Sequence, residues 1–197
     1  MYILKRLCIA ISIFLFCFSY DCAEVSDADF GFKTFERPCY FVNAENVPEQ
    51  ILRVAEYARI RNSNLSEKQA FEIGDAIWEV SYDYGLEFDL LAALIETESN
   101  FRINAVSEMG AKGLTQVMTT FLSGKDCWLQ ELIRKGIINE EREIFEINKN
   151  VMAGAYILKR CVDSSTTLHG ALWKYYGDKS IAYANSVMTN LKKVEAF

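Results

Sequence analysis

Glu98 is the residue whose position in the sequence points most directly to chemistry. An apolar stripe of Leu91, Leu94 and Ile95 continues at helical spacing to Glu98 and Phe101. On a helix this spacing places the Glu98 carboxyl on the face that packs against the core, where a charge is costly. Apolar surroundings raise the pKa of a carboxyl group and keep it protonated, as a general acid must be near neutral pH. We therefore expect Glu98 to donate a proton.

A second acid lies close by in the sequence but on another side of the expected helix. Glu96 precedes Glu98 by two residues, which corresponds to about 200° around a helix. We therefore expect one buried acid rather than a pair. The alternative for Glu98 is an ordinary residue of the last helical turn, solvated or paired with Arg102.

A loop with two glycines follows, and its polar residues are candidates for binding a ligand. The segment 107–116 reads SEMGAKGLTQ and opens into an expected helix. Gly110 and Gly113 permit tight turns and a close approach of the backbone to a ligand. Ser107 and Gln116 are suited to hydrogen-bonding a hydroxyl or amide group of a sugar. We expect this loop to line the binding site.

Helices are expected to position these residues, because the apolar spacing is helical throughout and no strand alternation extends beyond a few residues. Ser66 and Gln69 match a capping box, and Gly85 is suited to ending the helix that follows them. Asn150 is expected to cap a later helix. The fold class is therefore all-α, with helices expected at 49–61, 66–84, 89–100, 112–122, 128–135, 150–162, 167–176 and 180–194.

The N-terminal segment is typical of an export signal. Lys5 and Arg6 precede an uncharged run over 7–20, which is shorter than the roughly 20 residues that a membrane-spanning helix needs. This pattern predicts a secretory signal peptide at 1–23, with an uncleaved N-terminal anchor as the alternative. Residues 24–64 then form an N-terminal arm and helix, and 65–197 form the catalytic domain.

Composition and charge exclude several function classes. The formal net charge of −6 makes a phosphate backbone a poor partner, so we expect no nucleic acid. The chain has a single histidine, His169, and no CxxC spacing, so we expect no metal site. We also expect no cofactor.

Removal of the signal peptide leaves three cysteines in an oxidising compartment, where two of them can pair. A bridge between Cys127 and Cys161 is preferred. The alternatives are a disulfide that includes Cys39 and a structure with three free thiols.

Several motifs together resemble one enzyme family. They read YGL at 84–86, ALIETESNF at 93–101, NAVS at 104–107, GAKGLTQVM at 110–118, NVMAGAYIL at 150–158 and ALWKYYG at 171–177. This set is similar to the soluble lytic transglycosylase (SLT) family, whose domain has a lysozyme-like helical fold. The chain departs from the family pattern at Thr115 (usually methionine), Thr119 (commonly proline) and Tyr176 (usually asparagine).

The resemblance implies a peptidoglycan lytic transglycosylase, which cleaves the β-1,4 bond between MurNAc and GlcNAc. Glu98 matches the glutamate that protonates the glycosidic oxygen and then accepts the proton of the C6 hydroxyl, which closes a 1,6-anhydro ring. Ser107 and Gln116 match residues that line the glycan cleft, and Tyr175 matches the tyrosine that orients the glutamate. A single inward acid agrees with this chemistry, since ordinary glycosidases use two carboxyl groups.

The resemblance also sets expectations for location and partners. We expect a monomer, exported to the periplasm or the cell wall, that binds peptidoglycan glycan strands and has possible partners in a secretion or conjugation apparatus of the cell envelope. One alternative is a lysozyme-type hydrolase or endolysin, for which Glu108 is the nearby candidate for a second carboxylate. The other alternative is a non-catalytic peptidoglycan-binding component of a secretion apparatus.

Overall fold

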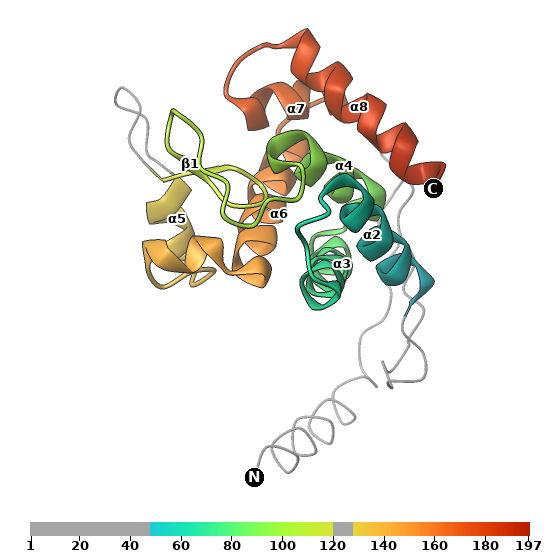
Figure 1. Cartoon of the computed structure of the whole chain (residues 1–197). Coiled ribbons are helices and arrows are strands. Elements are labelled where there is room, and N and C mark those ends of the chain that lie inside the picture. Colours follow the sequence, from blue (N-terminus) through green and yellow to red (C-terminus); the bar gives the residue numbers. More distant parts are fainter. Residues whose placement is uncertain (1–47, 120–127) are drawn as a thin grey trace, which may run out of the picture. The chain divides into compact units, whose positions relative to one another are not determined.

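Seven α-helices carry most of the described structure that positions Glu98 (Figure 1). The computed structural model describes residues 48–119 and 128–197, all of which belong to one compact unit. The α-helices are α2 (Glu49–Arg61), α3 (Glu67–Tyr84), α4 (Phe88–Ser99), α5 (Trp128–Arg134), α6 (Ile147–Asp163), α7 (Leu168–Tyr176) and α8 (Ile181–Glu195). A 3-10 helix, η1 (Glu141–Phe145), precedes α6. The expected signal peptide, Cys39 and Cys127 lie outside the described residues.

The helix ends follow the local chemistry of the sequence. Ser66 and Gln69 form a reciprocal capping box at the start of α3, and Gly85 ends this helix in the left-handed conformation. Thr167 and Ser180 accept hydrogen bonds from the backbone of α7 and α8. The structure confirms, to within a residue, the expected helices at 49–61, 89–100, 128–135, 167–176 and 180–194.

Helix α4 lies at the centre of the core. Its residues from Leu90 to Ile95 are all fully buried, because α2, α3 and α8 all pack against α4. A second apolar cluster includes Val117, Leu132 and Ile144 and lies beneath the segment that contains α5 and η1. In the described part of the chain, none of the helices has the length and hydropathy needed to cross a membrane.

The expected helix at 112–122 is wrong over its described residues. Residues 111–118 instead form a short antiparallel hairpin of β1 (Ala111–Lys112) and β2 (Val117–Met118). Gly110, Gly113 and Gln116 have φ values of 86°, 79° and 49°, which no right-handed helix can accommodate. The two glycines therefore fold the chain back on itself instead of opening a helix.

A further expectation needs correction. Helix α6 begins at Ile147 rather than at a cap on Asn150, and Asn150 is a buried residue of its first turn. Cys161 is a buried free thiol, and its expected partner Cys127 lies outside the described residues. Burial raises the pKa of the Cys161 thiol to about 11, which keeps the thiol protonated and unreactive near neutral pH.

Candidate active site

The Glu98 carboxyl lies in the last turn of α4, facing α8. Its Oε1 accepts a hydrogen bond from the Tyr183 hydroxyl. Desolvation raises the pKa of Glu98 to about 7, and the Tyr183 hydrogen bond opposes this rise in pKa. Glu98 thus has the protonation behaviour that a general acid and base requires near neutral pH.

Arg102 does not neutralise Glu98. Its Nε donates to the backbone oxygen of Ser99 at 2.9 Å, and Glu98 forms no ion pair with any residue that the structure describes. Without a nearby cation to stabilise the carboxylate, the desolvation of Glu98 is only partly offset.

Tyr183 is a residue of the candidate site that the sequence pattern did not single out. Burial and the charge of Glu98 raise its phenol pKa far above the ordinary value, so the hydroxyl stays protonated and remains a donor. Its ring stacks on Tyr176, with centroids 4.5 Å apart. Helical spacing in α8 is the available signal, since Tyr183 lies one turn before the buried Val187.

Tyr175 is expected to orient Glu98, but its hydroxyl hydrogen-bonds another group in this structure. The Tyr175 hydroxyl donates to the backbone oxygen of Thr115 at 2.8 Å, because Tyr175 occupies the last turn of α7 beside the hairpin loop. The charge of Glu98 still contributes to the raised pKa of Tyr175, after desolvation. The Tyr175 hydroxyl is therefore bound to the loop, and Tyr183 is the tyrosine that hydrogen-bonds Glu98.

Asn150 and Gly154 of α6 hold this loop in place. Asn150 Oδ1 accepts from the Thr115 backbone N–H and hydroxyl, both at 2.8 Å, and its Nδ2 donates to the backbone oxygens of Lys112 and Ile144. A Cβ atom added to Gly154 would lie 2.5 Å from Thr115 Cβ. Because α6 carries no side chain at this point, the loop and the helix come into close contact.

Ser107 and Gln116 lie on the same loop, and part of their hydrogen-bonding capacity supports the loop itself. Ser107 Oγ accepts from the Ala111 N–H at 2.9 Å, which leaves its hydroxyl hydrogen free to donate. Gln116 Nε2 donates to the Gly113 oxygen at 2.9 Å and to the Ala105 oxygen at 3.3 Å. Its Oε1 has no hydrogen bond within the described ranges. Each residue can still offer one polar group to a ligand.

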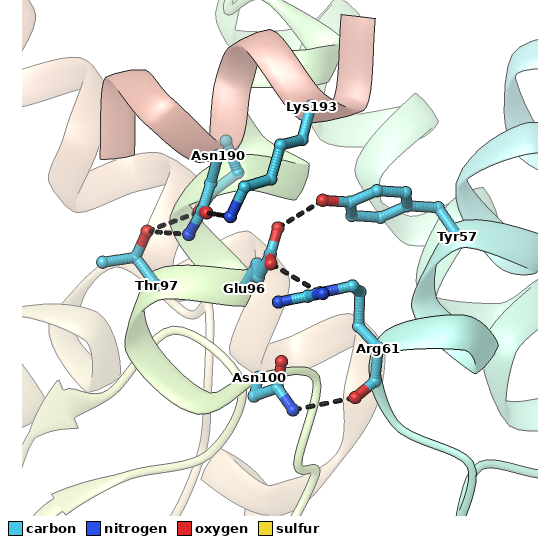
Figure 2. A network of polar contacts seen from close by, with 8 residues as sticks. Tyr57, Arg61, Glu96, Thr97, Asn100, Asn190 and Lys193 are labelled. Atoms are coloured by element: carbon cyan, nitrogen blue, oxygen red, sulfur yellow. Dashed lines mark hydrogen bonds and ion pairs between the residues drawn. The ribbon is translucent and has the colours of Figure 1, made fainter. Parts of the chain in front are cut away.

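The environment of Glu96 differs from the one that its sequence position predicts. It is 5% exposed, because α2 covers the face of α4 on which it lies. Tyr57 donates to its Oε2 at 2.6 Å, and Arg61 Nε lies 2.6 Å from its Oε1 (Figure 2). The helix therefore carries one buried acid, Glu96, and one partly buried acid, Glu98. Of these two, only Glu98 lacks a cationic partner among the residues described.

Other candidate groups do not add to the site. Glu108 is exposed on the loop. Over 48–119 and 128–197, no group of histidine, cysteine, aspartate and glutamate side chains is arranged to hold a metal ion.

Comparisons with known proteins match most of this region. The model of the transglycosylase SLT domain family matches residues 75–193, which is more than half of the chain. Membrane-bound lytic murein transglycosylase C of Edwardsiella ictaluri (strain 93-146) is 33% identical over 95 residues. This match covers 48% of the chain and 26% of the relative, so the chain spans about a quarter of that protein's length. No solved structure matches the chain.

Proposed function

The chain belongs to the transglycosylase SLT domain family, and on this basis we propose that it is a peptidoglycan lytic transglycosylase with Glu98 as its acid and base. The observation that carries the proposal is the state of Glu98. Its carboxyl is desolvated, lacks a cationic partner in the described part of the chain, is hydrogen-bonded by Tyr183 and has a pKa of about 7. A group with this pKa can both give and take a proton at neutral pH.

The reaction uses this carboxyl twice. Protonated Glu98 transfers its proton to the oxygen of the bond between MurNAc and GlcNAc, and the bond from C1 of MurNAc to that oxygen breaks. The N-acetyl group of the substrate assists at C1. The Glu98 carboxylate, stabilised by the Tyr183 hydroxyl, then takes the proton of the C6 hydroxyl as O6 bonds to C1. The product carries a 1,6-anhydro ring, and Glu98 is protonated again.

The arrangement of the acids favours this reaction over hydrolysis by two carboxylates. Ordinary glycosidases place their two carboxyl groups about 5–9.5 Å apart on either side of the bond. Glu96 is held by Tyr57 and Arg61, and Glu108 is exposed. Glu96, with both carboxyl oxygens engaged by α2, is therefore not available to activate a water molecule beside Glu98. A non-catalytic binding protein would have no use for a desolvated acid without a counter-ion.

We also propose the setting of the enzyme. The signal-peptide pattern at 1–23 supports export to the periplasm or cell wall, where peptidoglycan glycan strands are the substrate. A cell-envelope secretion or conjugation apparatus is the proposed protein partner, and the enzyme is proposed to act as a monomer. Ser107, Gln116 and Tyr175 are proposed to contact the glycan.

Mass spectrometry of the muropeptides released from purified sacculi tests the function. The proposal predicts sugar ends one water lighter than the hydrolysis product, since O6 replaces water as the nucleophile. Hydrated reducing ends would identify a hydrolase instead. Binding without any released muropeptide would identify a non-catalytic protein.

A further inference from the structure

Helix α2 contacts the turn of α4 that carries Glu98 through a set of buried polar contacts. One carboxyl oxygen of Glu96 accepts a hydrogen bond from the Tyr57 hydroxyl, and the other forms an ion pair with Arg61. Both oxygens therefore face α2 (Figure 2). We name Tyr57, Arg61 and Glu96 the Glu96 clamp. Tyr57 is itself fixed, because its ring packs edge-on against Phe101 and Phe197. A carboxylate that is 5% exposed needs such partners.

The same helix also holds the backbone just beyond Glu98. Asn100 and Phe101 both have positive φ values, 51° and 57°, which is unfavourable for residues other than glycine. Asn100 Nδ2 donates to the Arg61 oxygen at 2.9 Å, and Asn62 Nδ2 donates to the Phe101 oxygen at 3.0 Å. Consecutive residues persist in this conformation only where their surroundings hold them there. The end of α2 supplies that support.

The opposite side of this turn is held by α8. Asn190 Nδ2 donates to Thr97 Oγ1 at 3.0 Å, and Lys193 in turn donates to Asn190 (Figure 2). Glu98 itself is bound by Tyr183 of the same helix. Glu96, Thr97 and Glu98 are therefore each tied to a neighbouring helix, with Glu96 as the one that α2 holds.

We propose that α2, acting through the Glu96 clamp, is a positioning element that sets the place of the Glu98 carboxyl for proton transfer. Helix α2 lies outside residues 75–193, which match the family, so the positioning contact comes from the flanking chain. The inference rests on the proposed function of Glu98. It predicts that loosening the clamp lowers the rate of the chemical step, while the loop that binds the glycan is unaffected.

The chain provides a matched control for a purely structural role. Arg53 and Asp89 form another ion pair between α2 and α4, at the opposite end of α4 from Glu98. The test compares Glu96→Gln and Tyr57→Phe with Asp89→Asn. In Glu96→Gln the new amide keeps the size of the side chain and can still accept a hydrogen bond from Tyr57. The Arg61 side chain, which is 40% exposed, can turn to solvent. Tyr57→Phe removes one hydroxyl and no charge.

Each full-length variant is assayed on sacculi well below its melting temperature, so that all are fully folded. We expect Glu96→Gln to lower kcat about 10-fold or more, with KM within about 2-fold, because a small misplacement of a catalytic group is costly. Tyr57→Phe should change kcat in the same direction, and Asp89→Asn should keep kcat within about 2-fold of wild type. Equal kcat values for Glu96→Gln and Asp89→Asn would overturn the proposal.

Hydrogen exchange provides a reading that does not depend on activity. The Asn100 backbone N–H donates to the Glu96 backbone oxygen at 2.9 Å, so the exchange rate of this N–H reports opening of the turn. We expect faster exchange there in Glu96→Gln and Tyr57→Phe than in Asp89→Asn. Unchanged exchange would overturn the positioning role even if the wild type is active. If the two variants show faster exchange but the wild-type protein cleaves nothing, the Glu96 clamp is supported and the proposed function is refuted.

Discussion

Two opposing influences act on the proton of Glu98. Burial disfavours the carboxylate and raises the pKa, whereas the hydrogen bond from Tyr183 stabilises the carboxylate and lowers the pKa. The resulting pKa of about 7 lies close to the value that serves both halves of the proposed reaction. Tyr183 is thereby a partner that adjusts the acid, because its own raised pKa keeps it a donor throughout.

Replacement of Tyr183 by phenylalanine tests this balance. Since the Tyr183 hydrogen bond lowers the pKa of Glu98, its loss should raise that pKa and move the alkaline limb of kcat/KM to higher pH. The rate should also fall, because the carboxylate formed after proton transfer is less stable. The pH profiles of wild type and Tyr183→Phe measure both effects. A limb that stays in place or moves to lower pH would contradict this role.

The raised pKa of Glu98 also predicts how stability depends on pH. The folded protein binds the Glu98 proton up to a pKa of about 7, whereas the ordinary value is 4.5. The folded state therefore holds more protons between these values, and stability falls as pH rises through that window. The free energy of unfolding falls by about 3 kcal/mol across this window. Denaturant unfolding of wild type and Glu98→Gln at about pH 4.5 and pH 8 should show a loss of stability that is about 3 kcal/mol larger in wild type, and equal pH dependence would refute it.

Periodicity in the sequence is sufficient to single out Glu98 but not its neighbours. The apolar stripe continues to Glu98, and the structure desolvates this carboxyl. The same reasoning predicts that Glu96 faces away from the core, which is wrong because α2 covers a second face of α4. The Tyr183 hydrogen bond spans 85 positions of the sequence, and Arg61 comes from a separate helix. No local pattern encodes partners at such separations.

At the scale of elements, α6 serves as the platform for the loop over residues 107–116, which we propose to contact the glycan. The Asn150 side chain makes four hydrogen bonds to the loop and to η1, and Gly154 leaves space for Thr115. Thr115 in turn accepts from Tyr175. Thr115 is thus held from both α6 and α7.

Gly154→Ala should disturb this platform. The added Cβ would lie 2.5 Å from two carbons of Thr115, so the loop or the helix must move. Overpacking of this kind costs about 1–3 kcal/mol. The control is Gly170→Ala in α7, where the nearest atom, Thr167 Oγ1, lies at 3.2 Å and needs to move by only a few tenths of an ångström, while alanine has the better helix propensity. Thermal unfolding should show a clearly larger fall in Tm for Gly154→Ala than for Gly170→Ala. An unchanged Tm would show that the contact yields without cost.

Element boundaries in the sequence are predictable where a cap or glycine specifies them, as at Ser66, Gly85, Thr167 and Ser180. The segment 112–122 shows the limit of this reasoning. Two glycines followed by apolar residues suit either a helix start or a tight hairpin. The hairpin forms because Thr115 is held by the buried Asn150 of α6, a contact that local spacing does not reveal.

At the scale of the whole molecule, α2 belongs to the same apolar core as α3 and α4. Val54, Tyr57 and Ala58 are buried within that core. The sequence-based boundary at residue 65 separates α2 from the catalytic domain, although α2 contributes both apolar burial and the partners of Glu96.

A chain that begins at residue 65 should therefore be much less stable than the full protein. Burial of large aliphatic side chains contributes roughly 1.5–3 kcal/mol each, and Glu96 would lose its partners. Since small domains are stable by only about 5–15 kcal/mol, we expect the shortened chain to melt far lower or to remain unfolded. Circular dichroism during heating measures this. A melting temperature equal to that of the full chain would contradict the assignment of α2 to the core.

The central claim is that one carboxyl, that of Glu98, carries out the acid and base steps, and Glu98→Gln tests it most directly. The amide has the same size but cannot give and retrieve a proton. Loss of such catalysis lowers a rate about 10²–10⁴-fold. We predict this loss in the release of muropeptides from sacculi, with the helical circular dichroism spectrum retained and a Tm no lower than that of wild type. Activity above about a tenth of wild type in the folded variant would show that another group does the chemistry.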